Sequence, residues 1–244
     1  MASPLDQFAI KPIVDIEVGG VDISFTNSSL WMAITAVVLV AFMVISTHRR
    51  AMVPGRLQAS AEYFYHVIAD MVRDNVGAQG RAYFPFIFSL FMFILFGNLL
   101  GLIPGSFTFT SHIAVTFAMA AFIFVGVTII GIVIHGFKFF SLFFPHGAPI
   151  VSAPVLIPIE IISYFSRPIS LSVRLFANMT VGHVLLKVIG GGVVALGSFW
   201  VVPGLLPLAF LIAITLLEVM IAVIQAYVFA ILTCVYLNDA LHLH

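Results

Sequence analysis

The sequence of 244 residues is poor in charge and almost free of cysteine. Asp, Glu, Lys and Arg together make up 8% of it, whereas an ordinary soluble domain carries about 25%. The 10 basic and 10 acidic residues cancel, so no excess positive charge favours nucleic-acid binding. Cys234 is the single cysteine, which excludes an internal disulfide and any CxxC metal or redox motif. These shortages exclude an ordinary soluble domain.

Hydrophobic residues make up 62% of the chain. This composition is typical of an integral membrane protein, and the length suits one polytopic domain over residues 1–244. We predict an all-α fold with about three conventional spans, an interfacial amphipathic helix and a long, steeply tilted C-terminal helical hairpin. Residues 1–27 carry four acids, one lysine and no early apolar run. They are predicted to form an exposed, weakly structured external arm rather than a signal peptide.

Three apolar runs, residues 29–45, 83–103 and 113–134, are long enough to cross about 30 Å of hydrocarbon as helices. In residues 56–76, apolar and polar side chains instead fall on opposite helical faces, so this helix is predicted to lie in the interface or to meet a partner. Its predicted apolar face comprises Leu57, Phe64, Ile68, Met71 and Val72. A small-residue packing face is predicted in the second run, at glycines spaced four apart: Gly97, Gly101 and Gly105.

Two further apolar blocks, about 154–189 and 205–237, are divided by GGGVVALGSFWVVPG. At 1.5 Å per residue the second block would form a helix of about 50 Å, which exceeds a bilayer core of about 30 Å. We therefore predict a tilted hairpin over 150–238, with its turn outside and bends at Pro158 and Pro168. The glycine triplet of the divider lacks the GK[ST] of a phosphate loop and is predicted to form a flexible turn.

Cationic residues flank the predicted spans unequally. The predicted inner side carries Arg49, Arg50, Arg56, Arg73, Arg81 and Lys138, whereas the outer side carries only Lys11. Cytoplasmic loops of membrane proteins are enriched in Lys and Arg. The bias predicts an external N-terminus and a cytoplasmic C-terminus.

Most of the polar groups of the membrane region lie in the predicted hairpin. They are Glu160, Arg167, Arg174, Asn178, His183, Lys187, Glu218 and Gln225. On insertion scales each Arg, Lys or Asp at the centre of a span costs about 2.5–3.5 kcal/mol. Groups this costly indicate that the hairpin carries the function.

Helical phase sorts these groups. One face of the helix carries Glu160, Arg167 and Arg174, because residues seven apart differ in direction by only about 20°. Asn178, one turn after Arg174, lies on the same face. His183, nine residues after Arg174, falls on the opposite side. His183 and Glu218 can exchange protons when their surroundings favour it, whereas an arginine keeps its charge. His183 and Glu218 are therefore candidates for a proton relay, and Arg174 for a fixed charge.

Several of these residues also have a structural interpretation. Arg174 is either a fixed charge beside a proton path or the partner of Glu218 in a buried salt bridge. Glu160 and Arg167 either line such a path or sit at the inner surface, and Lys187 extends its amine to the outer interface. No metal or haem site is predicted, because no two of the three histidines His112, His135 and His146 share a metal-ligand spacing on one face.

Two stretches of the hairpin, PIEIISYFSRPISLSVRLFANMTVGH and LLEVMIAVIQAYVFAILTCVYL, closely resemble the a subunit of F-type ATP synthases. FGNLLGLIP resembles the second span of that family, and the similarity covers nearly the whole chain. It implies a stationary, non-catalytic subunit beside a rotating ring of c subunits, with two proton half-channels that reach the ring from opposite sides. It also implies the other synthase subunits as partners, with b subunits of the peripheral stalk expected at helix 56–76. No cofactor is implied, and a bacterial inner membrane is favoured over the mitochondrial inner membrane.

The resemblance gives roles to residues by position. Arg174 matches the essential arginine of the family, and Asn178 and Gln225 match the polar neighbours of that arginine. Glu160 and Arg167 are candidates for the inner half-channel.

His183 and Glu218 match the outer half-channel pair. Many bacterial members carry the acid on the earlier helix and the histidine on the later one, whereas here the order is reversed. The reversal predicts that His183 and Glu218 lie close together, in a hairpin that folds back near residue 200.

The main alternative is a free-standing secondary transporter in which Arg174 binds an anionic substrate. Such transporters are typically built from inverted repeats, whereas the two halves of this chain differ in charge content and span length. A retinal protein would need a lysine midway along a span, and Lys187 lies near the predicted outer end of its helix.

Overall fold

A computed structural model describes residues 9–15, 17–18, 21–22, 24–48, 51–103, 105–143, 153–197 and 201–242. Its α-helices are α1 (Asn27–His48), α2 (Arg56–Val76), α3 (Phe84–Gly101), α4 (Ile113–His135), α5 (Ala153–Gly197) and α6 (Val201–Leu241). Short 3₁₀ helices are η2 (Gly77–Ala82), η3 (Phe109–Ser111) and η4 (Gly136–Phe143). Within the described chain, five helices are long and apolar enough to cross a membrane: α1, α3, α4 continued into η4, α5 and α6. The predicted all-α polytopic fold is confirmed.

The amphipathic helix α2 has the predicted bounds, residues 56–76. Ile68, Met71 and Val72 of its predicted apolar face are buried, whereas Leu57 in the first turn is exposed. The ring centroids of Phe64 and Phe91 are 6.0 Å apart, so α2 packs on the start of α3.

The N-terminal arm contains secondary structure that was not predicted. β1 (Pro12–Val14) pairs antiparallel with β4 (Phe25–Thr26), and β2 (Glu17–Val18) pairs with β3 (Val21–Asp22). The side chain of Asn27 closes the arm onto α1, because Oδ1 accepts from the Lys11 amide at 3.2 Å and Nδ2 donates to the Ala9 carbonyl at 3.0 Å. The arm is therefore more ordered at its base than its polar sequence predicted.

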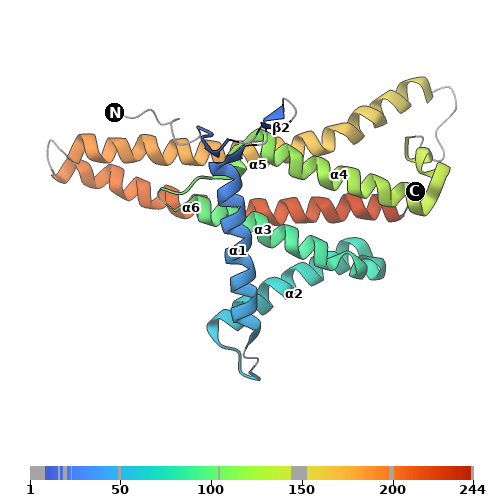
Figure 1. The fold of residues 1–244 in the computed structure, drawn as a ribbon, viewed down its shortest axis with the longest axis horizontal. Coiled ribbons are helices and arrows are strands. Elements are labelled where there is room, and N and C mark those ends of the chain that lie inside the picture. The colour runs from blue at the N-terminus through green and yellow to red at the C-terminus, as the bar shows by residue number, and fades with distance from the viewer. Residues whose placement is uncertain are drawn as a thin grey trace. The chain divides into compact units, whose positions relative to one another are not determined.

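The chain divides into two compact units, each built from segments that are distant in the sequence. The first comprises residues 1–50, 92–112 and 175–226, and the second comprises residues 51–91, 113–174 and 227–244. In the first unit, α1 packs on the end of α3 through Phe42 and Phe96, whose ring centroids are 5.3 Å apart. The C-terminal part of α5 and the N-terminal part of α6 lie side by side in the same unit (Figure 1). In the second unit, the hydroxyl groups of Thr128 on α4 and Tyr164 on α5 are 2.7 Å apart.

The predicted glycine face is confirmed at two of its three positions. A Cβ at Gly97 would overlap the ring of Phe109, and a Cβ at Gly101 would lie 2.6 Å from Oγ1 of Thr108. Gly105 differs because it lies in the turn after α3 with a φ of 90°, where open space surrounds it. Gly105 therefore serves the turn rather than the packing face.

The predicted flexible turn at Gly190–Gly192 is wrong, because α5 continues through these residues to Gly197. Glycine is common in membrane helices, where an interrupted helix would leave backbone groups unpaired in lipid. α5 also keeps its helical assignment through Pro158 and Pro168. α6 begins at Val201, so the fold-back falls near residue 200 as predicted, with 198–200 outside the described residues.

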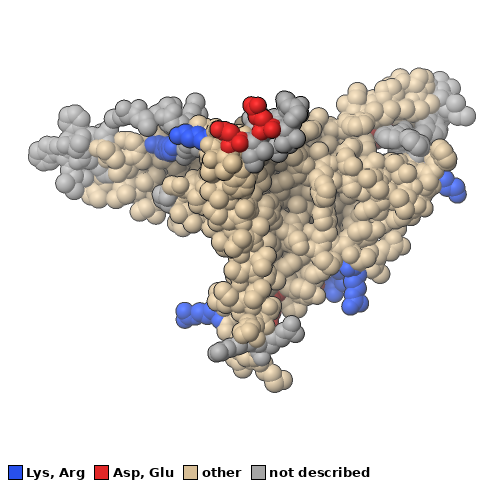
Figure 2. Space-filling model, viewed as in Figure 1, with Lys and Arg blue, Asp and Glu red and all other residues tan. Residues whose placement is uncertain are grey.

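The described surface is mainly apolar. Figure 2 shows a face of mostly uncharged side chains, with Lys, Arg, Asp and Glu gathered in a few places. Val37 on α1 is 68% exposed and Val133 on α4 is 77% exposed, as expected of helices that contact lipid tails. Arg49, Arg50 and His146, which entered the sequence-based predictions, lie outside the described residues.

Candidate functional site

Two amides of the predicted site are joined directly. Nδ2 of Asn178 on α5 donates a hydrogen bond of 2.9 Å to Oε1 of Gln225 on α6. Gln225 is buried, and its Nε2 has no hydrogen-bond partner among the described residues. The pair therefore links the two helices of the hairpin and leaves one buried donor available.

Arg174 lies one helical turn before Asn178 in α5 and is exposed. None of the ion pairs among the described residues includes it; they join Arg73 to Asp70 and Asp74, and Arg167 to Asp239. An arginine cannot become neutral, so its charge must be met by lipid headgroups, water or another chain. Arg174 therefore presents a permanent charge outward.

Glu218 of α6 is buried, with 5% of its surface exposed. Neither carboxylate oxygen has a hydrogen-bond partner among the described residues. Gly182 makes room for this carboxylate, because a Cβ at that position would overlap Oε1 of Glu218. A buried carboxylate without a partner is costly, which marks Glu218 as a candidate for function rather than for stability.

His183 follows Gly182 in α5 and borders a cavity of about 230 Å³. Its Nε2 lies 2.9 Å from Oγ1 of Thr108, in the segment between α3 and η3. The cavity is lined by Gly101, Leu102, Ile103, Gly105, Ser106, His183, Leu186 and Lys187. Glu218 lies against Gly182, the residue before His183, and no hydrogen bond among the described residues joins the carboxylate to the imidazole.

A buried polar network supports the same region of the first unit. Asn98 is fully buried and its Nδ2 donates to the Ala222 carbonyl at 3.3 Å. Its Oδ1 accepts from the hydroxyl of Thr110 at 2.9 Å, and the hydroxyl of Thr180 donates to the Ser111 carbonyl at 3.2 Å. These bonds fix α3, η3, α5 and α6 against one another. The sequence offered one signal for this network, a lone asparagine within an apolar span.

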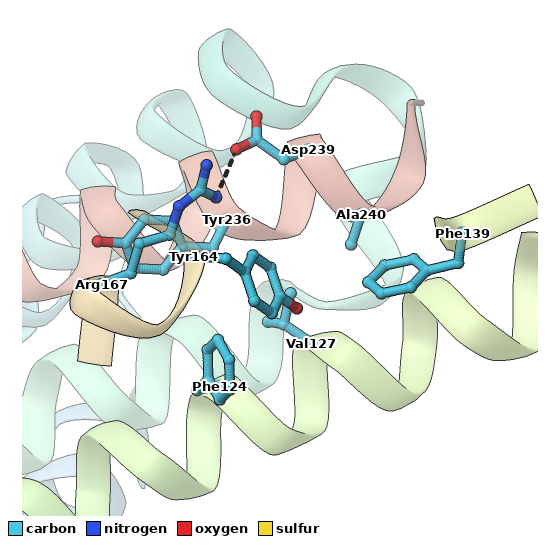
Figure 3. Close-up of a pocket in the computed structure, with 8 residues that line it drawn as sticks. All are labelled: Phe124, Val127, Phe139, Tyr164, Arg167, Tyr236, Asp239 and Ala240. Carbon is cyan, nitrogen blue, oxygen red and sulfur yellow. Dashed lines mark hydrogen bonds and ion pairs between the residues drawn. The ribbon is translucent and has the colours of Figure 1, made fainter. Parts of the chain in front are cut away.

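A second polar cluster lies in the second unit. Arg167 of α5 donates a hydrogen bond of 2.7 Å to Asp239 of α6, and both side chains are more than two-thirds buried. The guanidinium carbon is 5.7 Å from the ring centroid of Tyr164 and 5.2 Å from that of Tyr236, within the range of cation–π attraction. Figure 3 shows the pair beside an aromatic pocket of about 10 Å³, which has room for one water molecule.

The sequence-based site omitted Asp239, because its partner Arg167 is 72 residues away and the helical period relates residues of one helix only. Glu160, the other candidate for the inner half-channel, forms none of the ion pairs among the described residues. No group of three or more His, Cys, Asp or Glu side chains in the described chain is arranged to hold a metal ion.

Comparison with known proteins shows the family of the chain. The family model of the ATP synthase A chain matches residues 29–238. The chain belongs to the ATP synthase A chain family. It is 62% identical over 247 residues to ATP synthase subunit a of Paramagnetospirillum magneticum, with both chains covered completely. It is 60% identical to the Rhodospirillum rubrum subunit a over 244 residues, again with full coverage of both chains.

Identity extends to more distant members of the family. The subunit a of Parvibaculum lavamentivorans is 54% identical over 242 residues, which cover 98% of this chain and 93% of the relative. Membership places the chain in the membrane sector of ATP synthase, as an integral inner-membrane subunit that takes part in proton transport and ATP synthesis. The other synthase subunits are its partners.

Proposed function

We propose that the chain is the stationary half of the proton-driven rotary motor, with two proton half-channels that meet a rotating c-ring. The single observation that carries this proposal is Arg174, a permanent charge that is exposed on an apolar helix and absent from the described ion pairs. A membrane protein retains such a costly group when another chain supplies its counter-charge. The moving partner is a carboxylate on each c subunit.

The arginine has two tasks in this mechanism. A guanidinium favours the ionised form of a carboxylate that approaches it, so a ring carboxylate releases its proton there. The same charge repels a hydronium ion that would pass straight from one half-channel to the other. Each elementary charge that crosses 100 mV releases about 2.3 kcal/mol, which drives the ring in one direction.

The other polar residues serve the access routes. His183, Glu218 and the cavity beside His183 form the outer half-channel, and Asn178, bonded to Gln225, follows the arginine by four residues in the sequence. Glu160 and the Arg167–Asp239 pair belong to the inner side. The buried, unpartnered carboxylate of Glu218 supports this division, because it is suited to a transient proton rather than to a fixed bond.

The orientation follows the charge bias, with the N-terminus outside and the C-terminus in the cytoplasm of a bacterium. The b subunits of the peripheral stalk contact α2, whose Tyr63 and Tyr65 are exposed. The subunit itself is non-catalytic, because the chemistry of ATP takes place on other subunits of the complex.

Substitution of Arg174 tests the proposal. In membrane vesicles that contain the complete synthase, Arg174→Ala is expected to abolish proton-driven ATP synthesis while the subunit still inserts. Arg174→Lys is expected to fail as well, because a lysine in apolar surroundings can lose its proton. Arg81→Ala, at an exposed arginine of η2, is the control and is expected to couple normally. Normal ATP synthesis by Arg174→Ala would refute the proposed role.

A further inference from the structure

Thr108 is a buried side-chain partner of His183 that the predicted site did not include. Oγ1 of Thr108 and Nε2 of His183 share a hydrogen bond of 2.9 Å. The same hydroxyl also lies 3.1 Å from the carbonyl oxygen of Gly101, at the end of α3, and can donate to it. Only 6% of the Thr108 surface is exposed. Thr108 is therefore held between an imidazole, which changes its proton content, and a carbonyl, which only accepts.

A hydroxyl group carries one proton and two lone pairs, so it can pair with either form of an imidazole nitrogen. When Nε2 carries a hydrogen, the ring donates to Thr108 and Thr108 donates to Gly101. When Nε2 is bare, the hydroxyl turns and donates to the ring. The hydroxyl of Ser106 lies 2.9 Å from the same Gly101 oxygen and donates to it. The hydrogen of Ser106 is shared with the Ile103 carbonyl at 2.7 Å, so the Gly101 carbonyl keeps this shared donor when Thr108 turns, and the turned state has one hydrogen bond fewer at Thr108.

The packing around Thr108 keeps its hydroxyl in place. A Cβ at Gly101 would lie 2.6 Å from Oγ1 of Thr108, so the absence of a side chain there gives the hydroxyl its position. The hydroxyl of Ser111 donates to the Thr108 carbonyl at 2.6 Å and fixes the backbone. The cavity of about 230 Å³ borders the same imidazole and has room for several water molecules. His183 therefore lies between a fixed hydroxyl and a space for water.

We infer that Thr108 is a positioning residue for His183, which holds the imidazole in one orientation through both halves of its protonation cycle. This inference rests on the proposed role of His183 in the outer half-channel. Lys187, one turn later in α5, lines the same cavity as this imidazole, and Glu218 of α6 lies against Gly182, the residue before His183. A ring held in one orientation exchanges protons without first searching for its partners, which is the advantage of preorganisation.

The test compares variants of Thr108 in vesicles that contain the complete synthase, by ATP-driven proton pumping for each assembled complex. Thr108→Val keeps the shape and removes the hydroxyl, and it is expected to slow pumping about fivefold or more, the effect of one lost hydrogen bond. Thr108→Ser keeps the hydroxyl and is expected to pump nearly as the parent does. Thr35→Val is the matched control, because Thr35 is also buried and its hydroxyl donates to the Trp31 carbonyl of its own helix.

Combining Thr108→Val with His183→Leu distinguishes an effect on the orientation of the imidazole from a loss of packing. If Thr108 acts through the imidazole, Thr108→Val adds no further loss in the His183→Leu background. The inference is overturned if Thr108→Val slows pumping in the His183→Leu background by the same factor as in the parent. Normal pumping by Thr108→Val alone also overturns it. If the valine variant assembles poorly, Thr108→Ala is compared with Thr108→Ser, and equal pumping by these two overturns it as well. The proposed function fails by a different result, normal coupling by Arg174→Ala.

Discussion

Asn178 donates a hydrogen bond of 2.9 Å to Gln225, which ties α5 to α6 one helical turn beyond Arg174. The midpoint in sequence between Asn178 and Gln225 lies close to Val201, the first residue of α6. The hydrogen bond therefore sets which residues of α5 and α6 face each other in the first unit. Its energetic value is modest, because one intramolecular hydrogen bond contributes about 1 kcal/mol net. Its proposed value for function is that it holds two amides in a fixed relation to each other.

Removal of this bond is expected to impair function more than stability. Gln225→Leu removes the acceptor and also the buried Nε2 that has no partner among the described residues, so the thermal stability is expected to change little. Proton-driven ATP synthesis is expected to fall roughly fivefold, the effect of about 1 kcal/mol. A double-mutant cycle with Asn178→Leu checks the pairing. Simple addition of the two single effects would show that the amides act independently.

Gly182 is expected to tolerate no side chain while Glu218 is present. Gly182→Ala places a Cβ where Oε1 of Glu218 now lies, so the carboxylate must leave its buried position. Proton pumping by the assembled complex is expected to fall at least about fivefold, because buried overlap typically costs about 1–3 kcal/mol.

Two further variants make this prediction specific. Gly126→Ala on α4 is the control, because open space surrounds that glycine, and pumping is expected to remain normal. Glu218→Asp shortens the acid and is expected to restore part of the pumping that Gly182→Ala loses. If Gly182→Ala with Glu218→Asp pumps more slowly than Gly182→Ala alone, the overlap with Glu218 is not the cause of the loss of pumping.

The Arg167–Asp239 pair is expected to stabilise the second unit. Asp239→Asn weakens a bond of 2.7 Å to a guanidinium that also lies within cation–π range of two tyrosine rings. A charged, partly buried hydrogen bond contributes about 1–3 kcal/mol before the exposed share of the pair is discounted. We therefore expect a loss of about 1–2 kcal/mol, measured as a lower temperature of thermal inactivation in detergent.

A surface pair of the same chain serves as the reference. Arg73 lies 3.3 Å from Asp70, but both side chains are largely exposed, so Arg73→Ala is expected to cost less than about 1 kcal/mol. The exchange Arg167→Asp with Asp239→Arg is expected to recover stability relative to either single change. Equal losses at both pairs would mean that the tyrosines and the burial contribute nothing.

Much of the architecture could be predicted because apolar length and helical period are properties of a single segment. α2 runs from Arg56 to Val76 as the pattern of apolar and polar residues predicts. Gly190–Gly192 were predicted wrongly, because their intrinsic flexibility matters less where lipid leaves a broken helix without water to pair its backbone. The strands of the arm are too short for alternation to identify, since β2 and β3 have two residues each.

The candidate site could be predicted only in part, for a related reason. Arg174, Asn178 and Gln225 are conspicuous because polar groups are rare in apolar helices. Thr108 and Asp239 lie at the ends of apolar segments, where polar residues are ordinary, and their partners are 75 and 72 residues away. Only the folded chain brings such residues to His183 and Arg167.

Because Glu218 lies against Gly182, the residue before His183, the histidine and the acid are expected to be partly exchangeable. His183→Glu or Glu218→His alone leaves two acids or two imidazoles in one place, and each is expected to lower ATP-driven proton pumping. The double exchange restores one acid and one imidazole, so it is expected to pump faster than either single variant. Subunit content of the membranes is measured in parallel, since Glu218→His brings a larger side chain against Gly182. A double variant no faster than the poorer single variant, at equal subunit content, would show that the two side chains do not share one proton route.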